Sequence, residues 1–356
     1  MKDDYLWDGS GEPDPDVQEL ERTLGRYRHN QPTPSFDQVA EIRPVKQRWI
    51  FFNLRWSYQL GAVAAALLLA VTVFLVVRQR ADRNLGPSWD VARLEGTPRV
   101  GWHSLGEKSG PGKLGIGQTL VTDSSSRASL SLDETGRIEV EPDSRLKLLA
   151  SGPDRKRLSL ERGTIQATIW APAGSFGVDT PSAVAVDLGC VFTLHVDDSG
   201  AGIVRTTMGW VGFKLNGHES FIPAGAVCAT RPKVGPGTPY VEDAPAAFRD
   251  ALAEFDFVAT TPEERSALVS LLMKYARKED ALTLWHLLSR VSGADRAAVY
   301  HRLNVLAPRP ADVTRDGILR LDQKMLDSWW NSLGYGDIYL WHMYERDWSQ
   351  SQTSSK

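Results

Sequence analysis

The feature that most constrains this 356-residue chain is an uninterrupted apolar run, LGAVAAALLLAVTVFLVV, from Leu60 to Val77. The run contains no charge and no proline, and as a helix it would be about 27 Å long at ~1.5 Å per residue. That length approaches the roughly 30 Å hydrocarbon thickness of a bilayer. The run therefore predicts a single membrane-spanning helix, with the lipid bilayer as partner and a buried soluble helix as the alternative.

The flanks of the run indicate an anchor that is kept rather than cleaved. A secretory signal peptide begins close to the N-terminus, whereas 59 residues precede this run. Aromatic residues at Trp49, Trp56 and Tyr58 are typical of a membrane interface. Because basic residues are equally frequent on the two sides, the charge pattern does not set the orientation. We expect an anchor with its flanks over residues 49–80, followed by a linker over 81–100.

Composition limits the remaining possibilities. With 42% hydrophobic and 24% charged residues, the chain can form two domains besides its tails. Its net charge of −3 is unlike that of basic nucleic-acid-binding domains, so no direct contact with nucleic acid is expected. The two cysteines, Cys190 and Cys228, could form a disulfide in an oxidising compartment or remain two buried thiols.

The acidic segment 1–48 contains a candidate partner-binding helix. Asp14 is a favourable N-cap, and Pro15 suits the first helical position. The apolar residues that then share one helical face are Val17, Leu20, Leu24 and Tyr27. Because a helix this short is marginal alone in water, the pattern favours a partner, and Leu6 and Trp7 add apolar side chains upstream. The alternative is a solvated acidic tail.

From about residue 101 to residue 235 the hydrophobic period is two, which predicts half-buried strands. Turn signals separate these strands at intervals near ten residues, and Asn216-Gly217 is a strong hairpin signal. The pattern indicates an all-β sandwich, barrel or solenoid-like stack. The alternating pairs include Leu130 and Leu132, Ile138 and Val140, Leu146 and Leu148, Leu158 and Leu160, and Val184 and Val186.

Within this region the run from Val178 to Ala183, VDTPSA, followed by Gly189 and Phe192, resembles the V-x-T-P-x-A…G-x-x-F signature of the FecR family of transmembrane sigma-factor regulators. Leu160 to Gly163 resembles the family's L-x-x-G step, and Gly209 to Val211 with Pro223 to Gly225 resembles its ending. Cys190 stands where the family usually has Thr or Ser. We interpret the signature residues as structural: Gly163, Thr180, Pro181, Gly189, Phe192 and Gly225.

The resemblance implies a location and a partner. Family members keep a short N-terminal region in the cytoplasm, where it contacts an extracytoplasmic-function sigma factor, and hold the β domain in the periplasm. It therefore implies a single-pass protein of the bacterial inner membrane, with an unknown periplasmic or outer-membrane protein as second partner. The N-terminal segment here is shorter than the family's usual sigma-binding domain and lacks a zinc-type H-x-x-x-C-x-x-C pattern.

After a second linker, 236–245, the period becomes helical and predicts an all-α domain over 246–348. Thr261 to Glu264 reads as a capping box with Pro262 at the first helical position. One helix is expected from Thr314 to Leu333. The tryptophans and tyrosines of this domain are expected mostly in its core. Residues 349–356 are expected to form a disordered tail.

No arrangement of residues in the sequence indicates catalysis. The histidines are scattered without ligand spacing, and the glycines between Gly110 and Gly117 suit turns better than a phosphate loop. We therefore expect no enzyme activity, no cofactor and no metal site.

The expected fold class is a membrane-anchored α+β protein with a short cytoplasmic helix, one transmembrane helix, an all-β FecR-like domain and a C-terminal all-α domain. The expected function is a single-pass inner-membrane signal transducer of the anti-sigma type, which passes a periplasmic signal to an extracytoplasmic-function sigma factor. The alternative is a membrane-tethered periplasmic scaffold or ligand-binding protein without sigma-factor contact.

Overall fold

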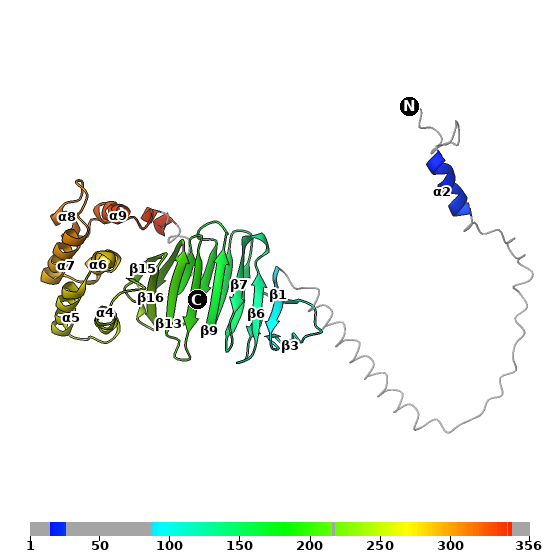
Figure 1. Cartoon of the computed structure of the whole chain (residues 1–356), viewed down its shortest axis with the longest axis horizontal. Helices are drawn as coiled ribbons and strands as arrows, with labels where there is room; N and C mark the ends of the chain where they lie inside the picture. The colour runs from blue at the N-terminus through cyan, green and yellow to red at the C-terminus, as the bar shows by residue number, and fades with distance from the viewer. Residues whose placement is uncertain (1–14, 26–86, 216–217, 340, 344–356) are drawn as a thin grey trace, which may run out of the picture. The chain divides into compact units, whose positions relative to one another are not determined.

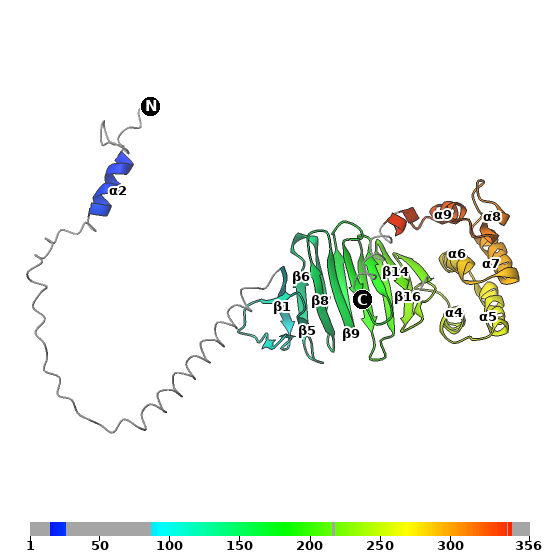
Figure 2. The ribbon, with the colours of Figure 1, turned by 180° about the vertical axis from the view of Figure 1, so that it is seen from behind.

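The computed structural model of the chain describes residues 15–25, 87–215, 218–339 and 341–343 (Figure 1). The chain divides into two units, Met1–Leu75 and Val76–Lys356. The described part of the first unit is the helix α2 (Pro15–Gly25). The second unit contains a β domain followed by a group of short helices, seen from opposite sides in Figures 1 and 2.

Two sheets that share the long strand β9 build the β domain. One sheet has the order β4-β1-β6-β7-β9-β12-β13-β16, with β17 and β18 both paired to β16. The other runs β3-β2-β5-β8-β9-β10-β11-β14-β15. The strands are β1 (Ser88–Glu95), β2 (Arg99–Val100), β3 (His103–Ser104), β4 (Gly112–Gly115), β5 (Thr119–Val121), β6 (Arg127–Ser131), β7 (Gly136–Val140), β8 (Arg145–Ser151), β9 (Lys156–Ile169), β10 (Phe176–Asp179), β11 (Val184–Asp187), β12 (Val191–Val196), β13 (Gly202–Met208), β14 (Trp210–Leu215), β15 (His218–Pro223), β16 (Ala226–Arg231), β17 (Gly235–Pro236) and β18 (Tyr240–Val241).

Strand β9 passes from one sheet to the other at Gly163. Its first half pairs with β8 and with the parallel strand β10, and its second half pairs with β7 and β12. Gly163 has a φ of +96°, and a Cβ atom there would lie 2.2 Å from the Oγ of Ser144. The same Oγ accepts a hydrogen bond of 2.9 Å from the backbone N–H of Thr164. Only glycine suits this crossing, because both the backbone angle and the space exclude a side chain.

The alternating hydrophobic pattern is confirmed in the core. Leu130, Ile138, Leu146, Leu158 and Ile165 come from both sheets, and each is completely buried. They belong to one continuous apolar cluster, so the two sheets enclose a single core.

Strand β1 lies in the segment 81–100 that was predicted to be a linker. Trp89 and Val91 are 1% and 0% exposed, whereas Asp90 and Ala92 between and after them face solvent. The alternation of buried and exposed residues is short, and the charged residues Arg93 and Glu95 follow it. The sequence pattern alone therefore did not indicate a strand. Pairing with β4 and β6, which lie farther along the chain, makes this segment a strand.

The helices after the β domain are α4 (Ala246–Phe257), α5 (Pro262–Tyr275), α6 (Ala281–Arg290), α7 (Gly293–Leu306), α8 (Arg315–Leu319) and α9 (Gln323–Ser332). The capping box at α5 is confirmed, since Thr261 accepts from the N–H of Glu264 and the Glu264 carboxylate accepts from the N–H of Thr261. The single helix expected over 314–333 is instead two. Leu321 has a φ of +59°, and the side chain of Asp322 caps α9, so the chain turns between α8 and α9.

The predicted fold class, a membrane-anchored protein with one transmembrane helix, is contradicted. No helix among the described residues is long and apolar enough to cross a membrane. The longest of these helices, α5 and α7, have 14 residues each, or about 21 Å of rise, which is shorter than the ~30 Å hydrocarbon layer. The predicted span from Leu60 to Val77 lies outside the described residues, as do the tail 349–356 and most of the segment 1–48.

The glycine at the β9 crossing allows a direct test of the fold. Gly163→Ala should destabilise the protein by about 3 kcal/mol or more, because it adds both a left-handed φ penalty and a clash with Ser144. Gly225→Ala is the matched control, since Gly225 also has a positive φ but open space around its Cβ position, and it should cost only about 1–2 kcal/mol. Chemical denaturation of both variants measures the difference. Equal losses would contradict a steric requirement at the crossing.

Candidate functional site

The helix α2 exposes an apolar stripe. Leu20 and Leu24 are each 58% exposed and share a face with the half-buried Val17. Acidic residues at Asp16, Glu19 and Glu21 surround the stripe. The structure thus brings three of the six predicted partner-binding residues together on one face. The other three, Leu6, Trp7 and Tyr27, lie outside the described residues.

A second candidate is a cavity of about 440 Å³ between the β domain and the helices. Phe221 of β15 lies on its β-domain side, and Trp285 of α6 lies on its helical side. Its polar lining includes Asp256 of α4, Arg265 of α5 and Arg290 of α6. The cavity therefore lies at the seam between two parts of one unit, a common position for ligand sites.

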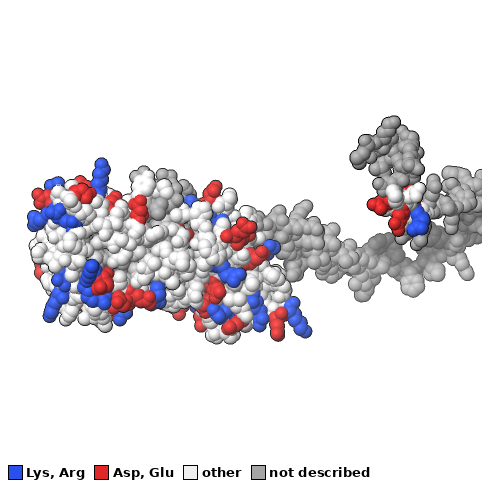
Figure 3. All heavy atoms as spheres, turned by 45° about the horizontal axis from the view of Figure 1, so that its top comes forward, with Lys and Arg blue, Asp and Glu red and all other residues white. Residues whose placement is uncertain are grey.

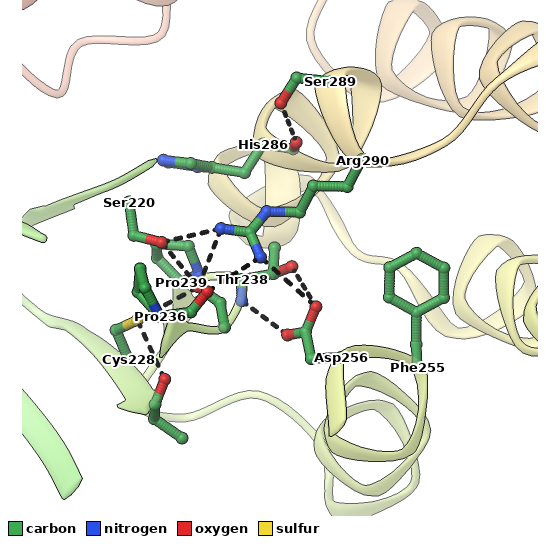
Figure 4. Close-up of polar contacts among 12 residues, drawn as sticks. Ser220, Cys228, Pro236, Thr238, Pro239, Phe255, Asp256, His286, Ser289 and Arg290 are labelled. Carbon is green, nitrogen blue, oxygen red and sulfur yellow. Dashed lines mark hydrogen bonds and ion pairs between the residues drawn. The ribbon is translucent and has the colours of Figure 1, made fainter. Parts of the chain in front are cut away.

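Arg290 is the centre of the polar contacts beside this cavity (Figure 4). Its Nη2 donates hydrogen bonds to the backbone oxygens of Glu219 and Gly237, at 2.9 Å and 3.1 Å, and to the Oγ of Ser220 at 2.9 Å. Its Nη1 donates to the backbone oxygen of Pro236 at 3.2 Å. One guanidinium, 9% exposed, thus joins α6 to β15 and to the chain that follows β16.

Asp256 balances this buried charge. Its carboxylate is 5% exposed and lies 3.6 Å from the guanidinium of Arg290. It also accepts hydrogen bonds from the backbone N–H and the hydroxyl of Thr238, at 2.6 Å and 2.9 Å. Burial raises the pKa of Asp256, while the Arg290 charge and the Thr238 hydrogen bonds oppose that rise. The ion pair therefore ties α4 and α6 to the end of the β domain.

His286, one turn before Arg290, is a structural histidine. Its Nε2 accepts a hydrogen bond of 3.1 Å from the backbone N–H of Phe221, so the ring proton is assigned to Nδ1, which lies 2.9 Å from the oxygen of Leu282. Burial lowers the pKa of His286 to about 3. The ring stays neutral near neutral pH and cannot serve there as a general acid.

The turn from Asp187 to Cys190 holds a buried carboxyl group. Asp187, at the end of β11, is 1% exposed and accepts from the backbone N–H groups of Gly189 and Cys190, at 3.1 Å and 3.0 Å. The Cys190 thiol also donates to this carboxyl group. Burial raises the pKa of Asp187 to about 7 and raises the pKa of the Cys190 thiol well above its ordinary value. The thiol is therefore unreactive.

Cys190 and Cys228 are both free, buried thiols. Cys228 of β16 pairs with Val204 of β13, which pairs with Leu194 of β12. Two strand spacings of about 4.8 Å, and the four positions from Leu194 back to Cys190 just before β12, therefore separate the cysteines. A disulfide needs Cα atoms within about 7 Å, so of the two possibilities left open by the sequence the structure has the buried thiols.

The other signature residues shape turns and core. The Thr180 hydroxyl accepts from the N–H of Ala183 and donates to its backbone oxygen, which closes the turn at Pro181. Gly189 has a φ of +80° with open space around its Cβ position, so its backbone angle, rather than a collision, requires glycine. Phe192 is 2% exposed and packs in the core.

The described residues contain no group of three or more His, Cys, Asp and Glu side chains that could hold a metal ion. On the face seen in Figure 3, basic and acidic side chains are interspersed over the second unit. The two candidate sites considered in the described part of the chain are therefore the exposed amphipathic helix α2 and the cavity between the β domain and the helices.

The Arg290–Asp256 pair and the burial of Asp187 were not predicted from the sequence. The two residues are 34 positions apart in the chain, and nothing in either local sequence indicates the partner. Asp187 had a usable signal, because it ends the apolar strand β11 and precedes Gly189 in a tight turn, where a carboxyl group accepts backbone N–H bonds.

Comparison with known proteins identifies the central part of the β domain. Residues 118–211 match the model of the family described as FecR protein. This range includes all the signature residues named above except Gly225. The resemblance inferred from the sequence is therefore confirmed for this part of the chain.

Two crystal structures of a candidate anti-sigma factor from Parabacteroides distasonis, at 1.65 Å and 2.50 Å resolution, are also similar. Both are 14% identical to this chain, and the matches cover 37% of it, with TM-scores of 0.31 and 0.32. The matches span 63% and 62% of the respective solved chains, which is less than two thirds of their length. No curated protein matches the chain.

The buried carboxyl group of Asp187 predicts a pH dependence. Its folded pKa of about 7 exceeds its ordinary value of 3.8, so between those values the unfolded chain loses a proton that the folded chain keeps. Asp187 therefore lowers stability as pH rises from about 4 to about 7, by up to roughly 4 kcal/mol. Relative to the unsubstituted protein, Asp187→Asn should become steadily more stable over this range.

Urea unfolding of both proteins across the pH range measures that difference. His286 titrates in the opposite sense, because its lowered pKa makes stability fall as pH drops below about 6.5, but its effect is common to both proteins and cancels. A constant difference from pH 4 to pH 7 would contradict the raised pKa of Asp187.

The buried ion pair predicts strong coupling between its members. Arg290→Met should cost about 3–5 kcal/mol, because it leaves the Asp256 carboxylate buried without its counter-charge. Adding Asp256→Asn should recover part of this loss in a double-mutant cycle followed by urea unfolding. The control is Arg205→Met, whose half-exposed pair with Glu242 should be worth at most about 1 kcal/mol. Additive effects at Arg290 and Asp256 would contradict direct coupling.

Proposed function

We propose, on the premise that residues 118–211 form a FecR domain, that this chain is an anti-sigma-type regulator whose helix α2 binds an extracytoplasmic-function sigma factor. The family match supports a regulatory rather than an enzymatic role. The observation that carries the specific proposal is the exposed apolar stripe of α2. An 11-residue helix is marginally stable by itself in water, and its two leucines, each 58% exposed, would be buried by a partner.

Charge indicates the kind of surface that α2 covers. From Pro15 to Gly25 the helix has three carboxylates and one guanidinium, hence a net charge of −2. The leucine stripe would enter an apolar groove, and the surrounding carboxylates would face a basic rim. A sigma factor contacts the DNA phosphates through basic surface. In the proposed mechanism α2 covers part of that surface and keeps the sigma factor from DNA until a signal releases it.

The β domain would receive the signal in this proposal, and its periplasmic location and contact with a second envelope protein stay predictions. The alternative, a ligand-binding protein without sigma-factor contact, has one observation in its favour, the cavity beside Arg290. The two functions differ in what they require of α2. Sigma-factor binding requires its exposed apolar face, whereas ligand binding in the cavity does not.

Substitutions on opposite sides of α2 test the proposal. Leu24→Asp adds a charge within the stripe, whereas Gln18→Asp adds the same charge on the polar side of the same helix. With the full chain and the sigma factor encoded nearest to its gene, Leu24→Asp should weaken binding about tenfold or more, since it buries an unpaired charge. Gln18→Asp should leave binding within about twofold.

Isothermal titration of the two purified proteins measures the affinities, and a promoter reporter measures the release of sigma activity. Circular dichroism of both variants checks that the second unit remains folded. Equal affinities of the two variants would overturn α2 as the contact. Absence of binding by the unsubstituted chain to every extracytoplasmic-function sigma factor of its genome would overturn the proposed function itself.

A further inference from the structure

The cavity between the β domain and the helices has the size and setting of a small-molecule site. Its volume of about 440 Å³ falls within the ~300–1,000 Å³ typical of such sites. Phe221 of β15, Trp285 of α6 and Leu326 of α9 all line it. The family match ends at residue 211, so every lining residue lies beyond the matched segment.

One wall of the cavity is aromatic and rigidly held. Trp285 packs edge to face against Trp330 and His286, with ring centroids 4.9 Å and 5.1 Å apart. Its indole N–H donates to the backbone oxygen of Leu326 at 2.9 Å, which sets the orientation of the ring. Because Trp285 is only partly buried, the ring keeps surface for a ligand. A fixed, partly exposed indole favours a flat ring as its partner.

Most polar groups of the lining are already occupied by the protein. Arg290 donates to three backbone oxygens and Ser220, and Asp256 is satisfied by Arg290 and Thr238. His286 uses both ring nitrogens on backbone groups. These side chains build the cavity, but they have little hydrogen-bonding capacity left for a ligand.

Arg265 differs from them. Its guanidinium stacks on the ring of Phe255, 4.0 Å from the centroid, and its Nη1 donates to the backbone oxygen of Phe255 at 2.8 Å. That is the one side-chain hydrogen bond described for Arg265, whose guanidinium has five N–H donors. A stacked, oriented guanidinium with free donors suits a carboxylate, which it can bind through two parallel hydrogen bonds.

An acidic group in the same lining limits the charge of the ligand. Asp256 lines the cavity, and its carboxyl group interacts electrostatically with Arg265 as well as with Arg290. This acidic group would repel a dianion such as phosphate more strongly than a single carboxylate. The lining therefore favours one negative charge placed at Arg265.

We propose that this cavity binds a small monocarboxylate that carries a flat ring, with the carboxylate on Arg265 and the ring against Trp285. The site does not involve α2. It can therefore exist whether or not α2 binds a sigma factor, and the two proposals fail independently.

The test uses the full chain with indole-3-acetate and phenylacetate as probes, and with indole-3-acetamide as the uncharged analogue. Calorimetric titration should show binding of the two carboxylates at millimolar concentration or below, and about tenfold weaker binding of the amide. Arg265→Gln should weaken carboxylate binding about tenfold. Arg315→Gln is the matched control, since Arg315 is an exposed arginine on α8 and should leave the affinity unchanged.

Urea unfolding separates weaker binding from damage to the fold, since Arg265→Gln should still unfold in one cooperative step while it binds the carboxylates more weakly. The tryptophan fluorescence of the protein should change with phenylacetate, whose ring does not emit in the indole range, but not with acetate, which has no ring. Absence of binding by both ring carboxylates, or equal affinities in the Arg265→Gln and Arg315→Gln variants, would overturn the proposal.

Discussion

Strand β9 belongs to both sheets, and the whole β domain depends on that double pairing. Its residues before Gly163 pair with β8 and β10, and those after it pair with β7 and β12, so one strand joins the two walls of the core. The positive φ of Gly163 and its contact with Ser144 make the crossing possible. With the crossing in place, the alternating leucines and isoleucines of both sheets face a single interior.

The helical part completes the unit by closing one end of this core. Trp330 and Trp341 belong to the same apolar cluster as the strands, and a Cβ atom on Gly212 of β14 would collide with the Trp341 ring. Beside them Arg290, paired with Asp256, donates to the backbone oxygens of Glu219, Pro236 and Gly237. The cavity arises where this aromatic packing and this polar network meet.

The two proposed activities therefore rest on different parts of the chain. The exposed stripe of α2 belongs to the first unit, and its role follows from unpartnered apolar surface and negative charge. The cavity belongs to the second unit and follows from tertiary packing around Trp285 and Arg265. A regulator that both covers a partner and senses a small molecule would need two such separate surfaces, although neither proposal requires the other.

Local patterns in the sequence determined the all-β character of the domain, the signature turn at Thr180 and Pro181, the capping box of α5 and the apolar face of α2, because each depends on residues within a few positions of one another. Only the tertiary structure decided that Ser88–Glu95 is a strand, that Cys190 and Cys228 are too far apart to bond, and that Arg290 meets Asp256. Each of these depends on residues that lie far apart in the chain. Their contacts are set by sheet register and helix packing, which no local pattern records.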